Sequence, residues 1–252
     1  MDLGLKGTAA IVCGASSGIG LAVARMLAEE GCSLTMLARD PDRLAAAAGP
    51  LEALAVAGDV RDRDAQRRVV DGTIEAYGRL DILVNNAGGP PAGTFETIPE
   101  EAFAEAFELT MNSAVRLTRL ALPHLRASGR GRIVNLSSWS VREPIPYLLL
   151  SNAIRPGLVG WAKSLAHELG PDGITVNTIA TGRVDTPRIR ELWAHQPDPA
   201  AAERADTESI PARRLAQPAE VSAAVAFLCS TQAAYISGAV LPVDGGALRG
   251  VW

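Results

Sequence analysis

Gly14-Ala15-Ser16-Ser17-Gly18-Ile19-Gly20 is the stretch of sequence that decides the fold. It directly follows a short apolar run at 8–13 and leads into an apolar stretch at 18–30. Glycines let the backbone approach a pyrophosphate closely, and the amides at a helix N-terminus carry partial positive charge. A lone glycine pattern would be weak evidence, but strand, turn and helix in this order are the context that a dinucleotide site requires. We therefore expect residues 14–20 to bind a dinucleotide rather than to form a purely structural turn.

Short apolar runs alternate with longer amphipathic stretches on both sides of this turn. The apolar runs, which we expect to be strands, lie at 8–13, 33–38, 53–57, 82–84, 132–136, 175–179 and 239–243. The amphipathic stretches, which we expect to be helices, lie at 18–30, 42–48, 62–77, 100–125, 157–169 and 218–230. This alternation indicates parallel strands joined by right-handed crossovers. Since no linker or repeat interrupts it, we expect one α/β domain over 1–252, a doubly wound parallel sheet (Rossmann fold) in three layers α/β/α.

Composition argues against several other classes of protein. Hydrophobic residues make up 48% of the 252 residues, charged residues 21%, and the formal net charge is -4. Acids and bases are interspersed, so no basic face is available for nucleic acid, and no apolar run is long enough for a membrane span. The start of the chain lacks the apolar segment of a secretory signal, and we expect a cytoplasmic protein. Cys13, Cys32 and Cys229 are expected to be buried hydrophobes, and no residues have the spacing of metal ligands.

Further motifs follow the glycine turn in a characteristic order. They are Asp59-Val60, Asn85-Asn86-Ala87-Gly88, the strand 131–138 that ends in Ser137-Ser138, and Asp244-Gly245-Gly246. Together with the G-x-x-x-G-x-G spacing of the turn, this set resembles the short-chain dehydrogenase/reductase family over nearly the whole chain. It is most similar to the classical members that include 3-oxoacyl-carrier-protein reductases. The resemblance implies an oxidoreductase that binds a nicotinamide dinucleotide and acts on a small carbonyl or alcohol substrate.

The resemblance also implies which residues contact the cofactor. Asp59 would hold the adenine edge, and residues 86–88 would border the adenosine ribose. Val184 and Thr186 would lie along the nicotinamide half. The full set of implied contacts is Gly14, Ser16, Ser17, Gly18, Ile19, Gly20, Arg39, Asp59, Val60, Asn86, Ala87, Gly88, Arg155, Val184 and Thr186.

The end of the second expected strand bears on the choice of coenzyme. An acidic side chain there would accept the 2′-hydroxyl of NAD and repel the 2′-phosphate of NADP. Ala38 occupies that place, and Arg39 follows with a charge that suits a phosphate, although Asp40 is available to pair with this arginine at the surface. We expect NADP(H) to be favoured over NAD(H).

The catalytic positions depart from the family's pattern. Most members use an Asn–Ser–Tyr–Lys set in which the last two residues form Y-x-x-x-K. Asn112 and Ser138 match, but Ser151 stands in the tyrosine place and Arg155 in the lysine place. The family's proton donor is therefore absent, because an aliphatic hydroxyl lies far beyond the pKa range of a phenol. Arg155 keeps a charge suited to the nicotinamide ribose hydroxyls but does not release a proton as a lysine can.

Two neighbours of this motif affect its geometry. Pro156 removes a backbone hydrogen bond, so we expect the helix to start late or bend there. Tyr147 is the phenol nearest the motif, one turn before Ser151 if the segment is helical. It is either a substitute acid or, as we favour, a residue that lines the substrate pocket.

Residues 183–215, rich in Arg, Pro and Ala, form the one irregular stretch. A loop this long in a compact domain is often a substrate lid, and we favour a lid over a poorly ordered insertion. Arg183, Arg188 and Arg190 hint at an anionic substrate, although a solvated face is the commoner explanation of such charges.

Three functions remain open at this stage. We favour an NADP(H)-dependent oxidoreductase with an unconventional proton source. The second function is an enzyme that reduces an already protonated iminium, a reaction that needs no strong acid. A non-catalytic NADP(H)-binding sensor or scaffold is the alternative. A small-molecule substrate is the expected partner. The segments 100–125 and 157–169 and the apolar end at Trp252 resemble surfaces that join family members, so we expect a homotetramer, with a dimer as the alternative.

Overall fold

A computed structural model of the protein describes residues 2–250, so Trp252 lies outside the described residues. Within that range seven strands form a single sheet in the order β3-β2-β1-β4-β5-β6-β7, and every neighbouring pair is parallel. The strands are Ala9–Cys13 (β1), Ser33–Ala38 (β2), Leu54–Ala57 (β3), Ile82–Asn85 (β4), Arg132–Ser138 (β5), Thr175–Thr181 (β6) and Val240–Val243 (β7). The strand order reverses direction between β1 and β4, which makes this the predicted doubly wound fold.

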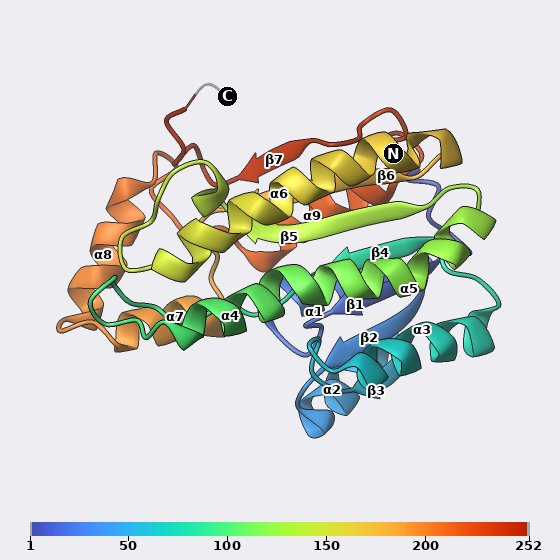
Figure 1. Ribbon diagram of the computed structural model, residues 1–252, viewed down its shortest axis with the longest axis horizontal. Coiled ribbons are helices and arrows are strands. Elements are labelled where there is room, and N and C mark those ends of the chain that lie inside the picture. Colours follow the sequence, from blue (N-terminus) through green and yellow to red (C-terminus); the bar gives the residue numbers. More distant parts are fainter. Residues whose placement is uncertain (1, 251–252) are drawn as a thin grey trace.

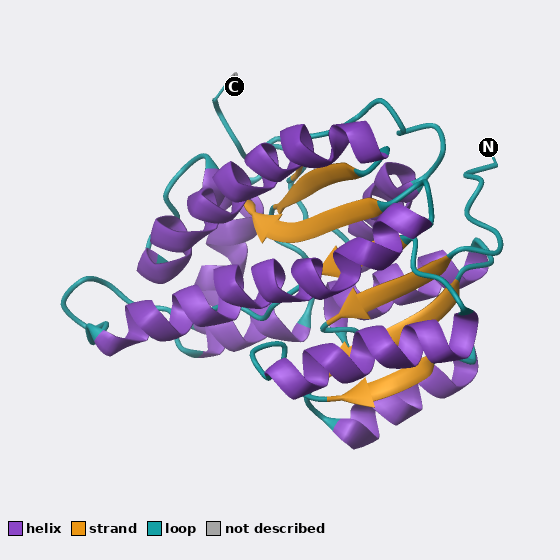
Figure 2. Ribbon diagram, turned by 45° about the vertical axis from the view of Figure 1, so that its right-hand side comes forward, coloured by secondary structure: helices purple, strands orange, loops and turns teal. Residues whose placement is uncertain are grey.

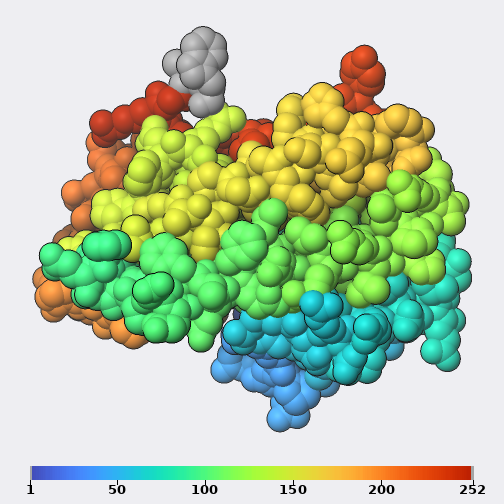
Figure 3. All heavy atoms as spheres, in the orientation of Figure 1, coloured from blue at the N-terminus to red at the C-terminus, as the bar shows by residue number. Residues whose placement is uncertain are grey.

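Helices cover both faces of the sheet (Figures 1 and 2). One face carries α1 (Gly18–Glu29), α2 (Pro41–Ala48) and α9 (Pro218–Cys229), whose buried residues share a core with β1, β2 and β4. The other carries α3 (Arg63–Tyr77), α5 (Ser113–Ala127) and α6 (Leu149–Leu169). Side chains of this second set hide most of the sheet in the space-filling view (Figure 3). The three layers α/β/α are therefore confirmed.

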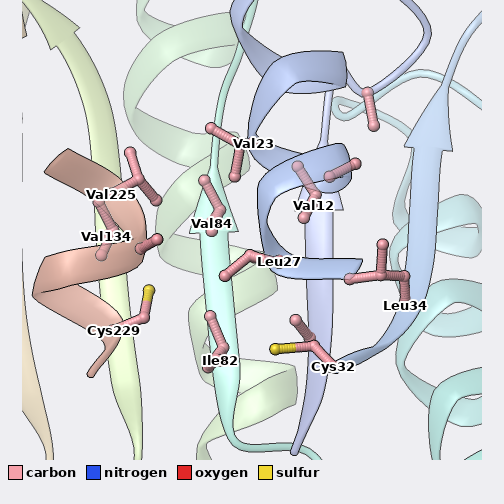
Figure 4. Packing of buried hydrophobic residues seen from close by; sticks show 14 of the residues in the cluster. Val12, Val23, Leu27, Cys32, Leu34, Ile82, Val84, Val134, Val225 and Cys229 are labelled. Atoms are coloured by element: carbon pink, nitrogen blue, oxygen red, sulfur yellow. The ribbon is translucent and has the colours of Figure 1, made fainter. Parts of the chain in front are cut away.

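The core beneath α1 and α9 shows how this layer is held. Val23 and Leu27 of α1 lie against Val84 of β4, and α9 packs beside them (Figure 4). Burial of such side chains is the main stabilising contribution, roughly 1.5–3 kcal/mol for each large one. Cys32 and Cys229 belong to the same core, and burial raises the pKa of both thiols. Both are free, so the expectation that they are small buried hydrophobes is confirmed.

The stretch 183–215 is not the irregular loop that its composition predicts. It forms two helices, α7 (Pro187–Ala194) and α8 (Pro199–Ser209), which lie beyond the carboxyl ends of the strands (Figure 1). Each begins with a proline in its first turn, where the missing N–H has no helical partner to lose. Asp198 caps α8 by accepting a hydrogen bond from the Ala201 amide at 2.9 Å. The prolines therefore mark helix starts rather than a loop.

Two further expected boundaries are wrong. The stretch 100–125 is not one regular helix but α4 (Glu101–Phe107), a π-helical turn (Glu108–Asn112) and α5. Helix α6 does not start late, since it runs unbroken through Pro156. Pro156 lies on the exposed side of α6, and the first turns of the helix are held by Leu150 and Ile154, which pack against α4. This packing keeps the segment helical despite the proline. No helix in the range 2–250 is long and apolar enough to span a membrane.

Candidate active site

The glycine turn between β1 and α1 is a cradle that a side chain would fill. Gly14 has φ +61, and a Cβ there would lie 2.7 Å from the Asn86 Nδ2 atom. A Cβ on Gly20 would lie 2.2 Å from the Gly14 carbonyl oxygen, closer than any real contact. Asn86 in turn donates to the Cys13 carbonyl at 3.1 Å, which ties the end of β4 to the end of β1. The turn therefore needs glycine at both positions and leaves open space above its backbone amides.

A cavity of about 760 Å³ extends from this cradle along the carboxyl ends of the strands. All of the residues that the family resemblance implies as cofactor contacts line it. They are Gly14, Ser16, Ser17, Gly18, Ile19, Gly20, Arg39, Asp59, Val60, Asn86, Ala87, Gly88, Arg155, Val184 and Thr186. Among residues 2–250, no group of three His, Cys, Asp or Glu side chains is arranged to hold a metal ion.

The β2 end of the cavity holds a mixture of paired and unpaired charges. Asp40 caps α2 by accepting from the Arg43 amide at 3.0 Å and pairs with the guanidinium of the same residue at 3.3 Å. Asp59 accepts two hydrogen bonds from the Arg61 guanidinium, which lower the pKa of its carboxyl. Arg39 makes no ion pair within the described part of the chain. The pairing of Asp40 with Arg39, considered as an alternative, is thus not present.

The other end of the cavity contains three of the residues that the sequence predicts at the catalytic positions. Ser138 ends β5, and its hydroxyl accepts a hydrogen bond from the Ser140 amide at 3.2 Å. Ser151 and Arg155 lie four residues apart on α6, so both project from one face of the helix, and both line the cavity. Asn152 makes two hydrogen bonds to the backbone of Ile145, which fix the β5–α6 loop against α6.

Arg155 is a buried cation that forms no ion pair with any residue in the range 2–250. Its side chain is enclosed, with only 8% of the residue exposed, and its Nε has no hydrogen-bond partner within residues 2–250. Burial and, to a smaller degree, the positive charge of Arg188 lower the pKa of Arg155 to about 10. A second cavity of about 20 Å³ lies beside it, large enough for one water.

Asn112, which the sequence predicts as a catalytic residue, lies on the π-helical turn but does not face the cavity. Asn112 lines neither cavity, and its amide donates to Glu108 at 2.7 Å. Glu108 also pairs with Arg116, and these bonds lower the pKa of its carboxyl. Thr110 instead lines the small cavity beside Arg155, with its hydroxyl buried and without a partner. Thr110 is therefore a site residue that the sequence motif missed.

Tyr147 lies outside both cavities. Its backbone has φ +61 just before α6 begins, and its carbonyl accepts from the Gly93 amide at 2.6 Å. The side chain is 60% exposed and lines neither cavity. The geometry therefore does not support Tyr147 either as a pocket residue or as a substitute acid.

Helix α7 closes one side of the cavity, in part through residues that the sequence did not single out. Ile189 and Leu192 of α7 line it, and Trp139 lines it from the turn after β5. Asp206 of α8 accepts from Trp193 at 2.8 Å and pairs with Arg183 at 3.0 Å. These two bonds anchor α8 to α7 and to the end of β6.

The three arginines at positions 183, 188 and 190 have different environments. Arg183 and Arg188 line the cavity, whereas Arg190 does not. Arg188 pairs with Glu191 at 3.1 Å and donates to the Pro90 carbonyl at 3.0 Å. Arg190 is exposed and pairs with an aspartate at 2.7 Å, so it belongs to the solvated face. Two of the three charges therefore face the cavity.

A doubly wound sheet with a glycine cradle at the start of its first helix defines a dinucleotide-binding protein. The family model described as enoyl-(acyl carrier protein) reductase matches residues 14–247. Together with the relatives below, this match shows that the chain belongs to the short-chain dehydrogenase/reductase family of oxidoreductases.

Similar proteins cover almost the whole chain. A putative ketoacyl reductase of the monensin polyketide synthase from Streptomyces virginiae is 36% identical over 250 residues, which cover 94% of this chain and 95% of that protein. L-fucose dehydrogenase from Bos taurus is 37% identical over 97% of this chain and 90% of its own. The crystal structure of L-sorbose reductase from Gluconobacter frateurii, complexed with NADPH and L-sorbose, matches with a TM-score of 0.93 at 35% identity, with 100% of both chains covered.

Proposed function

We propose that the protein is an NADP(H)-dependent oxidoreductase that acts on a small carbonyl or alcohol substrate, with Ser151 and Arg155 in place of the family's Tyr and Lys. One observation carries the proposal. A single cavity of about 760 Å³ joins the glycine cradle to Ser138, Ser151 and Arg155. A cavity of this size in one space suits a dinucleotide with a small substrate beside it.

The coenzyme preference is supported by the charges at the β2 end of the cavity. Ala38 offers no carboxylate to a ribose 2′-hydroxyl, and Arg39 has no ion pair within residues 2–250. The two acids that line the cavity, Asp40 and Asp59, are already paired with Arg43 and Arg61. An unpaired guanidinium suits a phosphate, because its planar donors match phosphate oxygens. The L-sorbose reductase of similar structure is complexed with NADPH, which agrees with this preference.

Other residues of the cavity have distinct parts in this function. The amides of 14–20, at the N-terminus of α1, would hold the pyrophosphate, and Asp59 would face the adenine. When bound, the nicotinamide group of the cofactor supplies or accepts the hydride. Ser138 and Ser151 present hydroxyls at the substrate end, where they would position the reacting oxygen.

The proton source is what sets this chain apart from its family. No tyrosine lines either cavity. A serine hydroxyl is too weak an acid to replace a phenol, and losing a positioned general acid costs about 10²–10⁴ in rate. The chain is therefore suited to substrates that need little acid assistance, or to a proton delivered by water through the small cavity beside Arg155 and Thr110.

Residues 183–215 act in this proposal as the substrate lid. Its helix α7 supplies Arg188, Ile189 and Leu192 to the cavity wall, and α8 packs against α7. The Arg183–Asp206 ion pair joins the start of the segment to α8, so its opening would require this pair to break.

The double replacement at 151 and 155 also favours a second candidate, a non-catalytic NADP(H)-binding sensor or scaffold. One experiment separates the two. Oxidation of NADPH, followed by absorbance at saturating cofactor over a panel of ketones, aldehydes, oxo acids and imines, should show turnover with at least one class. Tight NADPH binding without turnover on any member of the panel would favour the sensor.

A further inference from the structure

Two arginines of the cavity have no acidic partner within residues 2–250, and they lie at opposite ends of it. Arg39 follows β2, whereas Arg155 projects from α6, which packs on β5 and β6. The two acids that line the cavity, Asp40 and Asp59, are both engaged by arginines near β2 and β3. The positive charge of Arg155 is therefore not balanced by any acid among the described residues.

A buried and unbalanced cation is costly, because removing a charge from water is compensated only by a nearby counter-charge. Sugar hydroxyls are neutral and would leave this cost in place. The cofactor's pyrophosphate belongs at the start of α1, after β1, and two strand spacings separate the ends of β1 and β5 by roughly 10 Å. A cofactor in this position would therefore leave Arg155 without a counter-ion.

The surroundings of Arg155 indicate the charge that the missing group should carry. Arg188 lines the same cavity, and it adds a second positive charge that is balanced by Glu191 at 3.1 Å. Arg183 is balanced in the same way by Asp206 at 3.0 Å. The net formal charge of this end is thus +1, which matches one monoanion. A carboxylate satisfies this requirement, since its two oxygens accept both arms of a guanidinium.

We propose that Arg155, supported by Arg188, forms an anion site for the carboxylate of the substrate, and that the substrate is a small oxo acid or hydroxy acid. This inference rests on the proposed function for its reaction, but the binding site stands on charge and burial alone. Ser138 and Ser151 line the same end of the cavity and would face the carbonyl or hydroxyl oxygen of this substrate.

The test is calorimetric binding of acetoacetate to the protein loaded with NADP⁺, with methyl acetoacetate as the neutral analogue of similar shape. We expect the ester to bind at least about tenfold more weakly, because it cannot form a charge-assisted bidentate pair. Arg188→Gln should weaken acetoacetate binding several-fold. Arg190→Gln is the matched control, since Arg190 lies on the same helix, is exposed and does not line the cavity.

Arg155→Met should abolish the preference for the acid, and Arg188→Gln tests the site independently if that variant does not fold. Equal affinities for acid and ester would overturn the proposal, as would equal effects of the two glutamine variants. It would also be overturned if acetoacetate bound the cofactor-free protein but not the NADP⁺-loaded protein, because Arg155 would then pair with the cofactor. Selective acid binding without NADPH oxidation by any carbonyl compound would support the site and refute the proposed function. Turnover of neutral ketones without any preference for acids would support the proposed function and refute the anion site.

Discussion

Restoring the family's proton donor is the sharpest perturbation of this site. In the variant Ser151→Tyr with Arg155→Lys, both new side chains would project from one face of α6 into the same cavity, since the helix is continuous from Leu149 to Leu169. Positions four residues apart place their Cβ atoms about 5–6 Å from each other, within reach of a lysine that lowers the pKa of a phenol.

The expected gain follows from the value of a positioned general acid, about 10²–10⁴ in rate. The site has not been shaped around a tyrosine, so we expect a gain at or below the bottom of this range, roughly tenfold to a hundredfold in the single-turnover rate constant. The double variant should exceed either single change, because the two residues act as a unit. Pro156→Ala should add little, since α6 is already helical through Pro156.

The assay is single-turnover oxidation of bound NADPH by a neutral ketone, which makes no use of the Arg155 charge. Ser151→Phe with Arg155→Lys is the matched control, because it fills the same space without a phenol. If the double variant binds NADPH normally and is no faster than this phenylalanine control, Ser151 does not occupy the position of the family's tyrosine.

Further outcomes test the cofactor site, the surface and the assembly. NADPH should bind at least several-fold more tightly than NADH by calorimetry, and Arg39→Ala should remove the difference; equal affinities in the native protein would refute the role of this arginine. Gly20→Ala should leave the protein folded by circular dichroism but abolish nucleotide binding, because its Cβ would lie 2.2 Å from the Gly14 carbonyl oxygen. Hydrogen bonds from Arg214 lower the pKa of Glu220 from 4.5 to about 2, so the stabilisation from this pair is present above pH 4.5 and is lost as the pH falls toward 2. Carboxyl NMR should show this low midpoint, and Arg214→Ala should move it back toward 4.5; an unchanged midpoint would contradict the assignment. Light scattering should give about four times 26.3 kDa for a homotetramer, whereas a monomer at micromolar concentration would contradict any assembly.

The sheet could be predicted from sequence because its strands are short apolar runs that helices separate. Each of the seven expected runs contains or overlaps an observed strand. The two helices of 183–215 could not be predicted in the same way. Their prolines break the apolar pattern, and α8 has no buried residue to give it a periodic apolar face. The capping role of Asp198 before Pro199 was the available signal, and it is visible only when a proline is considered as a helix start.

The polar residue of the π-helical turn could not be placed by motif matching alone. A π turn shifts the faces of a helix, because it contains more residues than a regular turn. Asn112 matches the asparagine of the family's catalytic set in sequence, but its side chain bonds to Glu108. Thr110 lines the small cavity instead. Residues 110, 114 and 117 share that cavity at helical spacing, so the apolar stripe of α5, extended backward, points to Thr110.

Charge pairing is the property of this site that the sequence leaves most open, and the proposed coenzyme and substrate preferences depend on it. Asp40 is adjacent to Arg39 in sequence, yet it caps α2 and pairs with Arg43, three residues away. Arg188 and Arg190 are two residues apart, yet only Arg188 reaches the cavity. Since a charge acts on a ligand only when the fold leaves it unpaired and faces it inward, the coenzyme preference and the substrate class both depend on these contacts. On the proposed assignment, an arginine in the lysine place does more than remove a proton donor's partner, because it puts a buried cation where an anionic substrate would be held.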